Sequence, residues 1–222
     1  MCGRYSLYTD PEALAEHFEL DAVPRWTARY NIAPSPDILA IGLTREGQRR
    51  ASHLRWGLVP AWAHDASIGH KMINARAETV ADKPAFRRAF REHRCLVPAD
   101  GFFEWKRTGK TREPWYIRRR DGRPMAFAGL WERWTDRASG ERIASCAIIT
   151  TAANGVLAPI HDRMPVILER EAYAAWLDGG EELQSLLEPA DDAVLEAYRV
   201  DARVNNPRHE DPDCIRPLKA EN

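Results

Sequence analysis

Hydrophobic positions recur with helical spacing in four segments of the chain. The first opens with Thr9-Asp10-Pro11-Glu12, which combines a capping side chain, a proline in the first turn and an acidic residue. Its apolar face would consist of Leu14, Ala15 and Phe18. We expect helices that begin at Pro11 and at Pro84, and further helices around Glu171–Leu177 and Asp192–Tyr198.

Short runs of apolar residues with turn residues between them are typical of β-strands. They are Ile38–Leu43, Leu54–Leu58, Cys95–Pro98, Trp115–Arg118, Met125–Leu130, Ile143–Thr150 and Pro165–Leu168. Strands outnumber helices and do not alternate with them, which predicts an α+β fold rather than a parallel doubly wound one. We expect a mainly antiparallel, curled or barrel-like β-sheet flanked by several helices. The chain has no repeat and no clear linker, so residues 1–222 are predicted to form one domain.

The distribution of charge along the chain indicates what kind of partner the protein could bind. The net charge is only −1, yet residues 83–123 contain thirteen basic and five acidic residues, and residues 169–222 contain six basic and fourteen acidic ones. A basic middle beside an acidic tail favours a polyanion bound on one face, although ordinary solvated surface charges explain it equally well. No apolar run approaches the ~18–20 residues of a membrane span, and no secretory signal is present.

The four cysteines indicate a reducing compartment and no metal site. None belongs to a Cys-x-x-Cys motif or to a Cys/His cluster, so neither a structural metal nor a cofactor is implied. Cys95 and Cys146 lie in apolar runs and are predicted to be buried thiols. A cytoplasmic protein fits this pattern.

Cys2 is the strongest candidate for chemistry. Removal of Met1 would leave a cysteine with both a free α-amine and a free thiol. These groups titrate near ~8 and ~8.5, so a useful share of each would be nucleophilic at neutral pH. The amine can condense with an aldehyde to an imine, and the thiol can then close a five-membered thiazolidine. Position alone is equally consistent with a small second residue of no special role.

Two further segments place titratable groups in unusual surroundings. Glu104 lies among the aromatic residues of Gly101-Phe102-Phe103-Glu104-Trp105, where burial would raise its pKa and suit it to general acid–base catalysis. His161 lies between Pro159 and Pro165 beside Asp162, and it could transfer protons near neutral pH. The alternatives are a surface glutamate on a strand and a structural histidine paired with Asp162.

Residues suited to nucleic acid occur near these segments. Asn74 offers an amide donor and acceptor, and Arg76 offers a guanidinium for phosphate. Trp56 and Trp105 lie in segments where aromatic and basic residues interleave, a combination that binds single-stranded nucleic acid. Most of the eight tryptophans are nevertheless expected to pack in the core.

Taken together and in this order, nine segments resemble the SRAP family (SOS response-associated peptidase), the abasic-site processing proteins. The matching segments are 1–5, 30–34, 55–62, 73–79, 94–105, 127–131, 149–154, 161–165 and 204–207, so the resemblance extends over about residues 2–217. Each segment alone is weak evidence, whereas nine in order are highly specific. One local departure is Pro36, where we expected a more polar residue.

The resemblance implies a function and a set of site residues. Such proteins bind single-stranded DNA that contains abasic sites and join covalently to the ring-opened sugar, whose aldehyde is the electrophile that an aminothiol captures. By resemblance, Cys2 is the nucleophile, Asn74 orients it, Glu104 is the general acid/base and His161 handles the sugar hydroxyl proton. The residues expected at DNA are Arg4 and Arg76 at phosphates, with Asn31, Pro34, Trp56, Trp105 and Thr150 lining the groove.

The resemblance also implies autoproteolytic exposure of Cys2, which a methionine aminopeptidase could equally achieve, and β-elimination (AP-lyase) as a side activity. By default we expect a monomer, associated with the nucleoid when bound to DNA. Two other classes remain open. An N-terminal-nucleophile cysteine hydrolase would use Cys2 on amides, with its own amine as the base. A non-catalytic single-strand-binding module would not need Cys2 at all.

Overall fold

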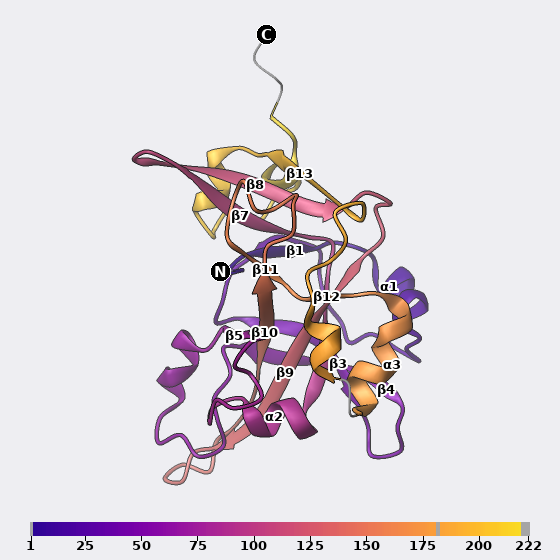
Figure 1. Cartoon of the computed structure of the whole chain (residues 1–222). Coiled ribbons are helices and arrows are strands. Elements are labelled where there is room, and N and C mark those ends of the chain that lie inside the picture. The colour runs from indigo at the N-terminus through magenta and orange to yellow at the C-terminus, as the bar shows by residue number, and fades with distance from the viewer. Residues whose placement is uncertain (1, 181–182, 219–222) are drawn as a thin grey trace.

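The computed structural model describes residues 2–180 and 183–218, which form two β-sheets with short helices around them (Figure 1). The first sheet has the order β13-β8-β7-β1-β2 and is antiparallel throughout. Its strands are β1 (Tyr5–Leu7), β2 (Arg29–Ile32), β7 (Gly101–Thr108), β8 (Thr111–Arg119) and β13 (Leu195–Arg199). This sheet lies at the top of the molecule in Figure 1.

The second sheet contains a closed barrel. Its strands are β3 (Asp37–Leu43), β4 (Arg49–Trp56), β5 (Asn74–Arg76), β6 (Arg94–Ala99), β9 (Met125–Thr135), β10 (Arg142–Ala152), β11 (Arg163–Pro165) and β12 (Ile167–Leu168). Because β10 pairs with both β4 and β9, the order β10-β4-β3-β6-β9 closes into a ring of five strands. The pairs that β10 forms with β4 and β5 are parallel and the others are antiparallel, which confirms the predicted α+β fold with a barrel-like sheet.

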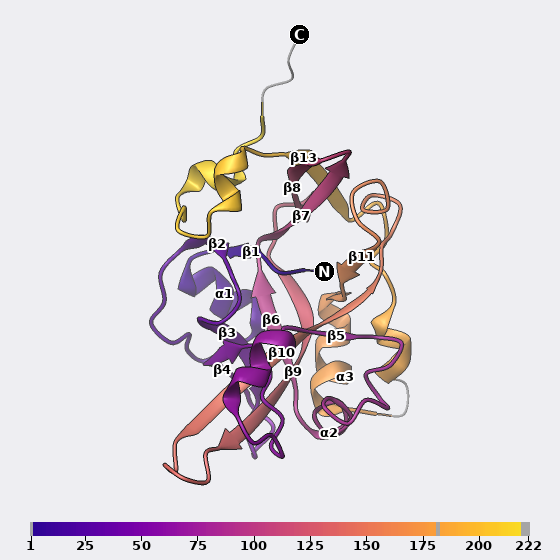
Figure 2. The same ribbon diagram turned by 90° about the vertical axis from the view of Figure 1, so that its left-hand side faces the viewer.

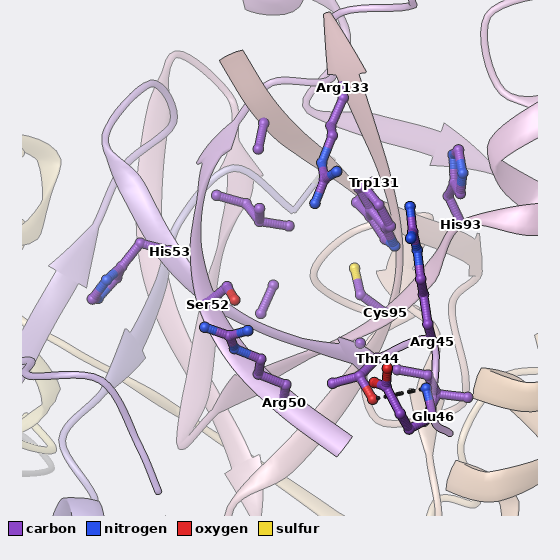
Figure 3. Close-up of a pocket in the computed structure, with 15 residues that line it drawn as sticks. Thr44, Arg45, Glu46, Arg50, Ser52, His53, His93, Cys95, Trp131 and Arg133 are labelled. Atoms are coloured by element: carbon purple, nitrogen blue, oxygen red, sulfur yellow. Dashed lines mark hydrogen bonds between the residues drawn. The ribbon is translucent and has the colours of Figure 1, made fainter. Parts of the chain in front are cut away.

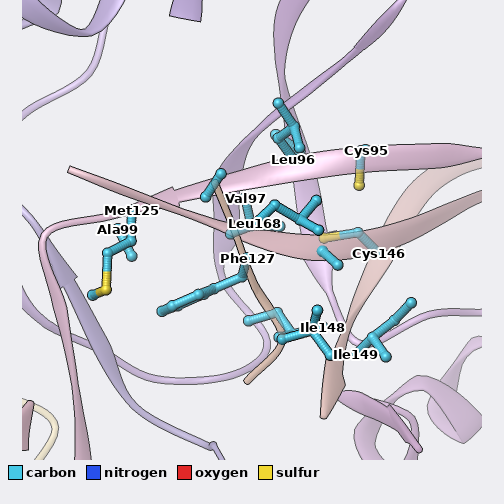
Figure 4. Packing of buried hydrophobic residues seen from close by; sticks show 14 of the residues in the cluster. Cys95, Leu96, Val97, Ala99, Met125, Phe127, Cys146, Ile148, Ile149 and Leu168 are labelled. Carbon is cyan, nitrogen blue, oxygen red and sulfur yellow. The ribbon is translucent and has the colours of Figure 1, made fainter. Parts of the chain in front are cut away.

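The barrel encloses the main hydrophobic core (Figure 4). Leu96, Phe127 and Ile148 come from three of its strands and are fully buried. Cys95 and Cys146 lie in the same core, which confirms the prediction that they are buried thiols. Burial of these side chains stabilises the barrel by about 25 cal/mol for each Å² of apolar surface removed from water.

The first helix forms as predicted. In α1 (Pro11–Phe18), the Asp10 carboxylate accepts hydrogen bonds from the backbone N–H groups of Glu12 (3.1 Å) and Ala13 (3.0 Å). The helix buries Leu14 and Phe18, and it ends at Glu19, whose φ of 56° lies in the left-handed region. A capping side chain of this kind stabilises a helix by about 1 kcal/mol.

Two other helices are confirmed with changed boundaries. The second, α2 (Arg87–Glu92), begins later than Pro84, because the chain first makes a hydrogen-bonded turn there. The third, α3 (Tyr173–Asp178), is preceded by the 3₁₀ turn Arg170–Ala172 and stops at Gly179, whose φ is 88°. Further 3₁₀ turns are Ala66–Lys71, Leu183–Leu187, Ala202–Asn205 and Pro212–Ile215.

The helix predicted around Asp192–Tyr198 is wrong, because this segment contains strand β13. All five of its residues pair with β8, from Leu195 opposite Arg119 to Arg199 opposite Trp115. The side chain of Glu196 also accepts a 2.8 Å hydrogen bond from Arg118. The free edge of β8 therefore outweighs the helix propensity of alanine, leucine and glutamate here.

Strand β4 also differs from its prediction, since it begins at Arg49 and ends at Trp56 rather than at Leu58. Gly57 stops the strand because its φ is 135°, a conformation that other residues rarely adopt. A Cβ atom at Gly57 would in addition lie 2.7 Å from the carbonyl oxygen of Gly69. The chain turns away here and returns as β5, which continues the pairing along β10.

Candidate active site

The first residues of the chain run between the two sheets, close to β5 and β11 (Figure 2). Cys2 is fully buried there, directly before β1. Its carbonyl oxygen accepts a 2.9 Å hydrogen bond from Nδ2 of Asn74. Asn74 is the first residue of β5 and pairs in parallel with Ile148 of β10, so a barrel strand holds it in place.

The amide of Asn74 retains an unused acceptor. Its Oδ1 atom is buried and has no hydrogen-bond partner within the described part of the chain. A buried acceptor without a partner costs about 1–3 kcal/mol, which makes such groups uncommon in folded proteins. Because Nδ2 of the same amide holds the Cys2 carbonyl, Oδ1 is positioned to accept a proton donor close to Cys2.

Glu104 approaches the same place from β7. Its side chain is only 4% exposed, and burial raises its pKa above the ordinary value, while the nearby His161 lowers it in part. A raised pKa makes a carboxyl group a better proton acceptor than an ordinary glutamate and lets it return the proton. The sequence therefore correctly placed Glu104 among buried aromatic neighbours, and the surface alternative is wrong.

His161 completes the group from the loop before β11. Its Nε2 atom lies 3.9 Å from Oε2 of Glu104, and its Nδ1 atom accepts a 3.0 Å hydrogen bond from the backbone N–H of Arg163. The neutral ring must then carry its proton on Nε2, the nitrogen that faces Glu104. Oδ1 of Asp162 lies 3.1 Å from the same Nδ1 atom, so the other neutral tautomer or a protonated ring would donate to this carboxylate, as the structural alternative expected.

Arg163 is a positioning residue that the sequence analysis did not select. Its guanidinium binds the carboxylate of Glu78 through both terminal nitrogens and donates a 2.6 Å hydrogen bond to the carbonyl of Thr150. These contacts fix the histidine loop against β10. The available signal was the density of charged residues between two prolines, which was attributed to His161 alone.

The thiol of Cys2 differs from its expected state. Burial raises its pKa well above the ordinary value, and the charge of Glu104 raises it further. Burial therefore opposes ionisation of this thiol at neutral pH. A reaction through sulfur needs a base to take the thiol proton, and Glu104 is the carboxylate close enough to affect it.

Four of the residues expected at DNA are at least partly exposed. Arg76 is exposed at the end of β5, and Pro34 is half-buried in the loop between β2 and β3. Arg4 and Trp105 are also half-buried, with the Arg4 guanidinium 5.6 Å from the centre of the Trp105 ring. Arg4 donates hydrogen bonds to Oδ1 of Asn31 (2.7 Å) and to the carbonyl of Val204 (2.8 Å), so part of its guanidinium is already used.

The remaining three are buried and hold backbone segments together. Trp56 donates a 3.0 Å hydrogen bond from Nε1 to the carbonyl of Ile73, and Thr150 makes a 3.4 Å one to the carbonyl of Ala75. Both side chains are about 1% exposed, and Asn31 is fully buried. Their burial does not fit the expected contact with DNA. The sequence did not reveal this, because the alternation of residues along a strand does not show which face of the sheet is covered. The exposed tryptophan is instead Trp62, at 52%.

Replacing Asn31 by alanine is expected to lower the free energy of unfolding by about 2–3 kcal/mol, because buried partners would lose their hydrogen bonds. Its Nδ2 atom lies within 3.2 Å of three backbone carbonyls, and its Oδ1 atom holds Arg4. Urea denaturation measures the change. Asn206→Ala removes an exposed amide and should stay within about 0.5 kcal/mol of the native chain; an equal loss in both variants would contradict this role for Asn31.

The described residues give no support for a metal site or a membrane span. Among residues 2–180 and 183–218, no three His, Cys, Asp or Glu side chains are arranged to hold a metal ion. No helix in those ranges has both the length and the apolar character needed to cross a membrane.

Comparison with known proteins gives one consistent family. The chain is 44% identical over 223 residues to the abasic site processing protein YoqW of Bacillus subtilis, a match that covers 97% of this chain and 99% of that protein. It is 34% identical over 183 residues to the abasic site processing protein YedK of Escherichia coli, covering 80% and 79% of the two chains. A crystal structure of a protein from Bacteroides thetaiotaomicron matches with a TM-score of 0.85 at 28% identity, over 98% of this chain and all of that one.

The family model described as SOS response associated peptidase matches residues 1–207, which is nearly the whole chain. It includes Cys2, Asn74, Glu104 and His161, the four residues that the fold brings together from separate segments. The chain is a member of the SRAP family.

Proposed function

We propose that this protein processes abasic sites in single-stranded DNA by joining itself covalently to the exposed sugar aldehyde through Cys2. The observation that carries the proposal is the meeting of Cys2 with Asn74, Glu104 and His161, which come from four distant segments. The names of its relatives, abasic site processing proteins, support abasic sites as the substrate.

The proposed reaction begins with hydrolysis of the Met1–Cys2 peptide bond, by the protein's own peptidase activity or by an aminopeptidase, which frees the Cys2 amine; Met1 lies outside the described residues. The amine adds to the C1′ aldehyde of the open sugar, and loss of one water molecule gives an imine. The thiol then adds to the imine carbon and its proton passes to nitrogen, which closes a thiazolidine. The product contains all atoms of protein and DNA except that water.

Each residue of the site has one part in this sequence. Asn74 holds the Cys2 carbonyl through Nδ2 and presents Oδ1 to the amine. Glu104 gives a proton to the departing water as the imine forms, and it then takes the thiol proton and passes it to nitrogen as the ring closes, a task that its raised pKa suits. His161 carries a proton on Nε2 beside Glu104 and supplies it to the sugar oxygen during ring opening. If the imine is not captured by sulfur, the same base permits β-elimination as an AP-lyase side reaction.

The strand would be held by the exposed groups around this site. We assign Arg76 to a phosphate next to the lesion, and Trp105 with Arg4 and Pro34 to the groove wall. Asn31, Trp56 and Thr150 support that wall from beneath, since they are buried. The protein would act as a cytoplasmic monomer that associates with the nucleoid when it binds DNA.

Intact-mass spectrometry tests the proposal directly. The purified protein is incubated with a single-stranded oligonucleotide that carries one abasic site, and with the same oligonucleotide lacking it. The expected result is loss of Met1 and a heat-stable species equal to protein plus DNA minus one water, formed only with the abasic strand. Retention of Met1 together with the absence of this species would overturn the mechanism; loss of Met1 with cleavage of amide substrates would favour a cysteine hydrolase.

Arg76→Ala is expected to weaken binding to single-stranded DNA of any sequence, because the exposed guanidinium would lose one phosphate contact. Fluorescence anisotropy across a series of salt concentrations should show the slope of log K against log salt falling by about 0.7. Arg137→Ala serves as the matched control, since Arg137 is exposed at the far end of the β9–β10 hairpin. An unchanged slope in Arg76→Ala would remove this residue from the phosphate contacts.

A further inference from the structure

A cavity opens between the β3–β4 and β9–β10 hairpins (Figure 3). Its volume is about 740 Å³, within the range of small-molecule sites. It exists because β10 pairs with β4 only at two positions, Ser145 opposite Arg55 and Cys146 opposite Trp56. Beyond these pairs the two strands separate, and the wall of the barrel is open.

This cavity is distinct from the candidate active site. Ala144 of β10 lines it, whereas Asn74 of the candidate active site pairs with Ile148 of the same strand. The four residue steps from Ala144 to Ile148 correspond to about 13 Å of extended strand. Packed core side chains of the barrel, among them Phe127 and Ile148, occupy the space between the two ends. The cavity can therefore take a ligand of its own.

The cavity gathers arginines that lack acidic partners. Arg45, Arg50 and Arg133 line it, and none of them forms an ion pair with a carboxylate of the described residues. Some arginines elsewhere are paired with carboxylates, as Arg29 is with Glu210 and Arg163 with Glu78, whereas exposed ones such as Arg137 and Arg142 are not paired within the described part of the chain. Like charges that share a cavity repel each other, and a bound anion removes that cost.

The other groups of the cavity fit the same kind of ligand. Trp131 is stacked with His93 at 4.5 Å between ring centres, and the Arg133 guanidinium lies 5.5 Å from the Trp131 ring. These contacts hold Arg133 at the wall and occupy the indole ring, so a planar base has little room to stack. The carboxylate nearest to this cluster, Glu132, already lies beside His93 and Arg88, which leaves Glu46 as the one acidic side chain among the lining residues.

We propose that this cavity is a second binding site, which takes a phosphate-bearing ligand with at least two negative charges through Arg45, Arg50 and Arg133. Guanidinium groups bind phosphate oxygens through paired hydrogen bonds, and three of them around one cavity match a pyrophosphate-like group. The phosphates come either from a free compound or from a part of the DNA strand that passes this end of the barrel. The site does not depend on the reaction proposed for Cys2.

Isothermal titration calorimetry of the full chain with inorganic pyrophosphate tests the proposal. Arg50→Gln combined with Arg133→Gln should weaken binding by about 100-fold, since each substitution removes a charge-assisted contact worth about tenfold. Arg45→Gln alone should weaken it about tenfold for the same reason. The matched control combines Arg137→Gln with Arg142→Gln, two exposed arginines of the same hairpin that do not line the cavity. The control variant should bind pyrophosphate with the same affinity as the native chain.

Failure of pyrophosphate to bind the native chain, or equal weakening in the control, would overturn the proposal. All substituted side chains are exposed, so unchanged thermal unfolding is expected and is measured alongside. A titration with an undamaged single-stranded oligonucleotide then identifies the source. If the cavity variants lose DNA affinity and pyrophosphate competes with DNA, the strand supplies the phosphates; if DNA affinity is unchanged, the ligand is a free compound. The yield of abasic crosslink reports the Cys2 site separately.

Discussion

Cys2→Ala is expected to reduce the heat-stable adduct with abasic single-stranded DNA to background, while non-covalent binding of the same strand remains. Alanine keeps the α-amine, so an imine can still form, but without sulfur it cannot close the ring and hydrolyses on heating. Cys2 is fully buried and offers no surface to a phosphate, so the affinity for undamaged DNA should change little. Denaturing gel electrophoresis after heating measures the adduct, and anisotropy measures binding.

The matched control for this experiment is Cys214→Ala. Cys214 is also buried and free, but it packs in the small cluster with Phe103, Tyr116, Val200 and Val204 rather than beside Glu104. Its adduct yield should equal that of the native chain. Equal yields of heat-stable adduct in Cys2→Ala and in the native chain would show that the thiol is not needed. Cys2→Ser separates ring closure from imine formation, because a hydroxyl should give at most a heat-labile product.

Glu104→Gln is expected to slow formation of the adduct by about 10²–10⁴-fold, the usual contribution of a positioned acid–base group. Glutamine has the shape of glutamate but cannot take the thiol proton, and burial raises the pKa of that thiol. The rate is measured from gel samples taken over time at saturating DNA. Glu113→Gln, on β8 of the same sheet, is the matched control and should react at the native rate.

The stability of the same variant has a predictable pH dependence. Burial holds the pKa of Glu104 above its unfolded value near ~4.3, so the ionised carboxylate costs stability above the folded pKa. This cost disappears as the pH falls through the folded pKa toward the unfolded one. Glu104→Gln should therefore gain stability relative to the native chain at pH 7.5 and lose that gain at pH 4, as measured by urea denaturation. A variant that is both slower and less stable at pH 7.5 would point to a structural role instead.

Local signals in the sequence were enough for elements whose stability is local. The capping residue and the apolar face of α1 predicted this helix correctly, and a run of apolar residues predicted strand β3. Strands β1, β2 and β5 were not predicted, because runs of three or four residues carry little pattern and depend on their partners. The segment of β13 has a helical composition, and only the open edge of β8 makes it a strand.

In the candidate site, too, some features could be predicted from the sequence and others depended on the fold. Cys2, Asn74, Glu104 and His161 could be named from residue type and family resemblance, and the fold brings them together. Burial could not be read in this way: Asn31 and Trp56 have the side chains of ligand-binding residues, yet their polar atoms hold backbone carbonyls inside the protein. The tautomer of His161 depends on one backbone N–H, which no sequence pattern indicates.

The complete burial of Cys2 has a consequence for the lifetime of the proposed adduct. Sulfur and nitrogen of the linkage would lie where Cys2 lies now, between the two sheets and directly before β1. Spontaneous hydrolysis needs water at the thiazolidine carbon that comes from the sugar aldehyde. A protease needs a flexible, unpaired segment of the chain, which strands held in a sheet do not provide. The lifetime of the adduct would then depend on how often β1 detaches from β2 and β7. A local opening of the protein, rather than the chemistry of the sugar, would limit the rate at which the adduct is removed.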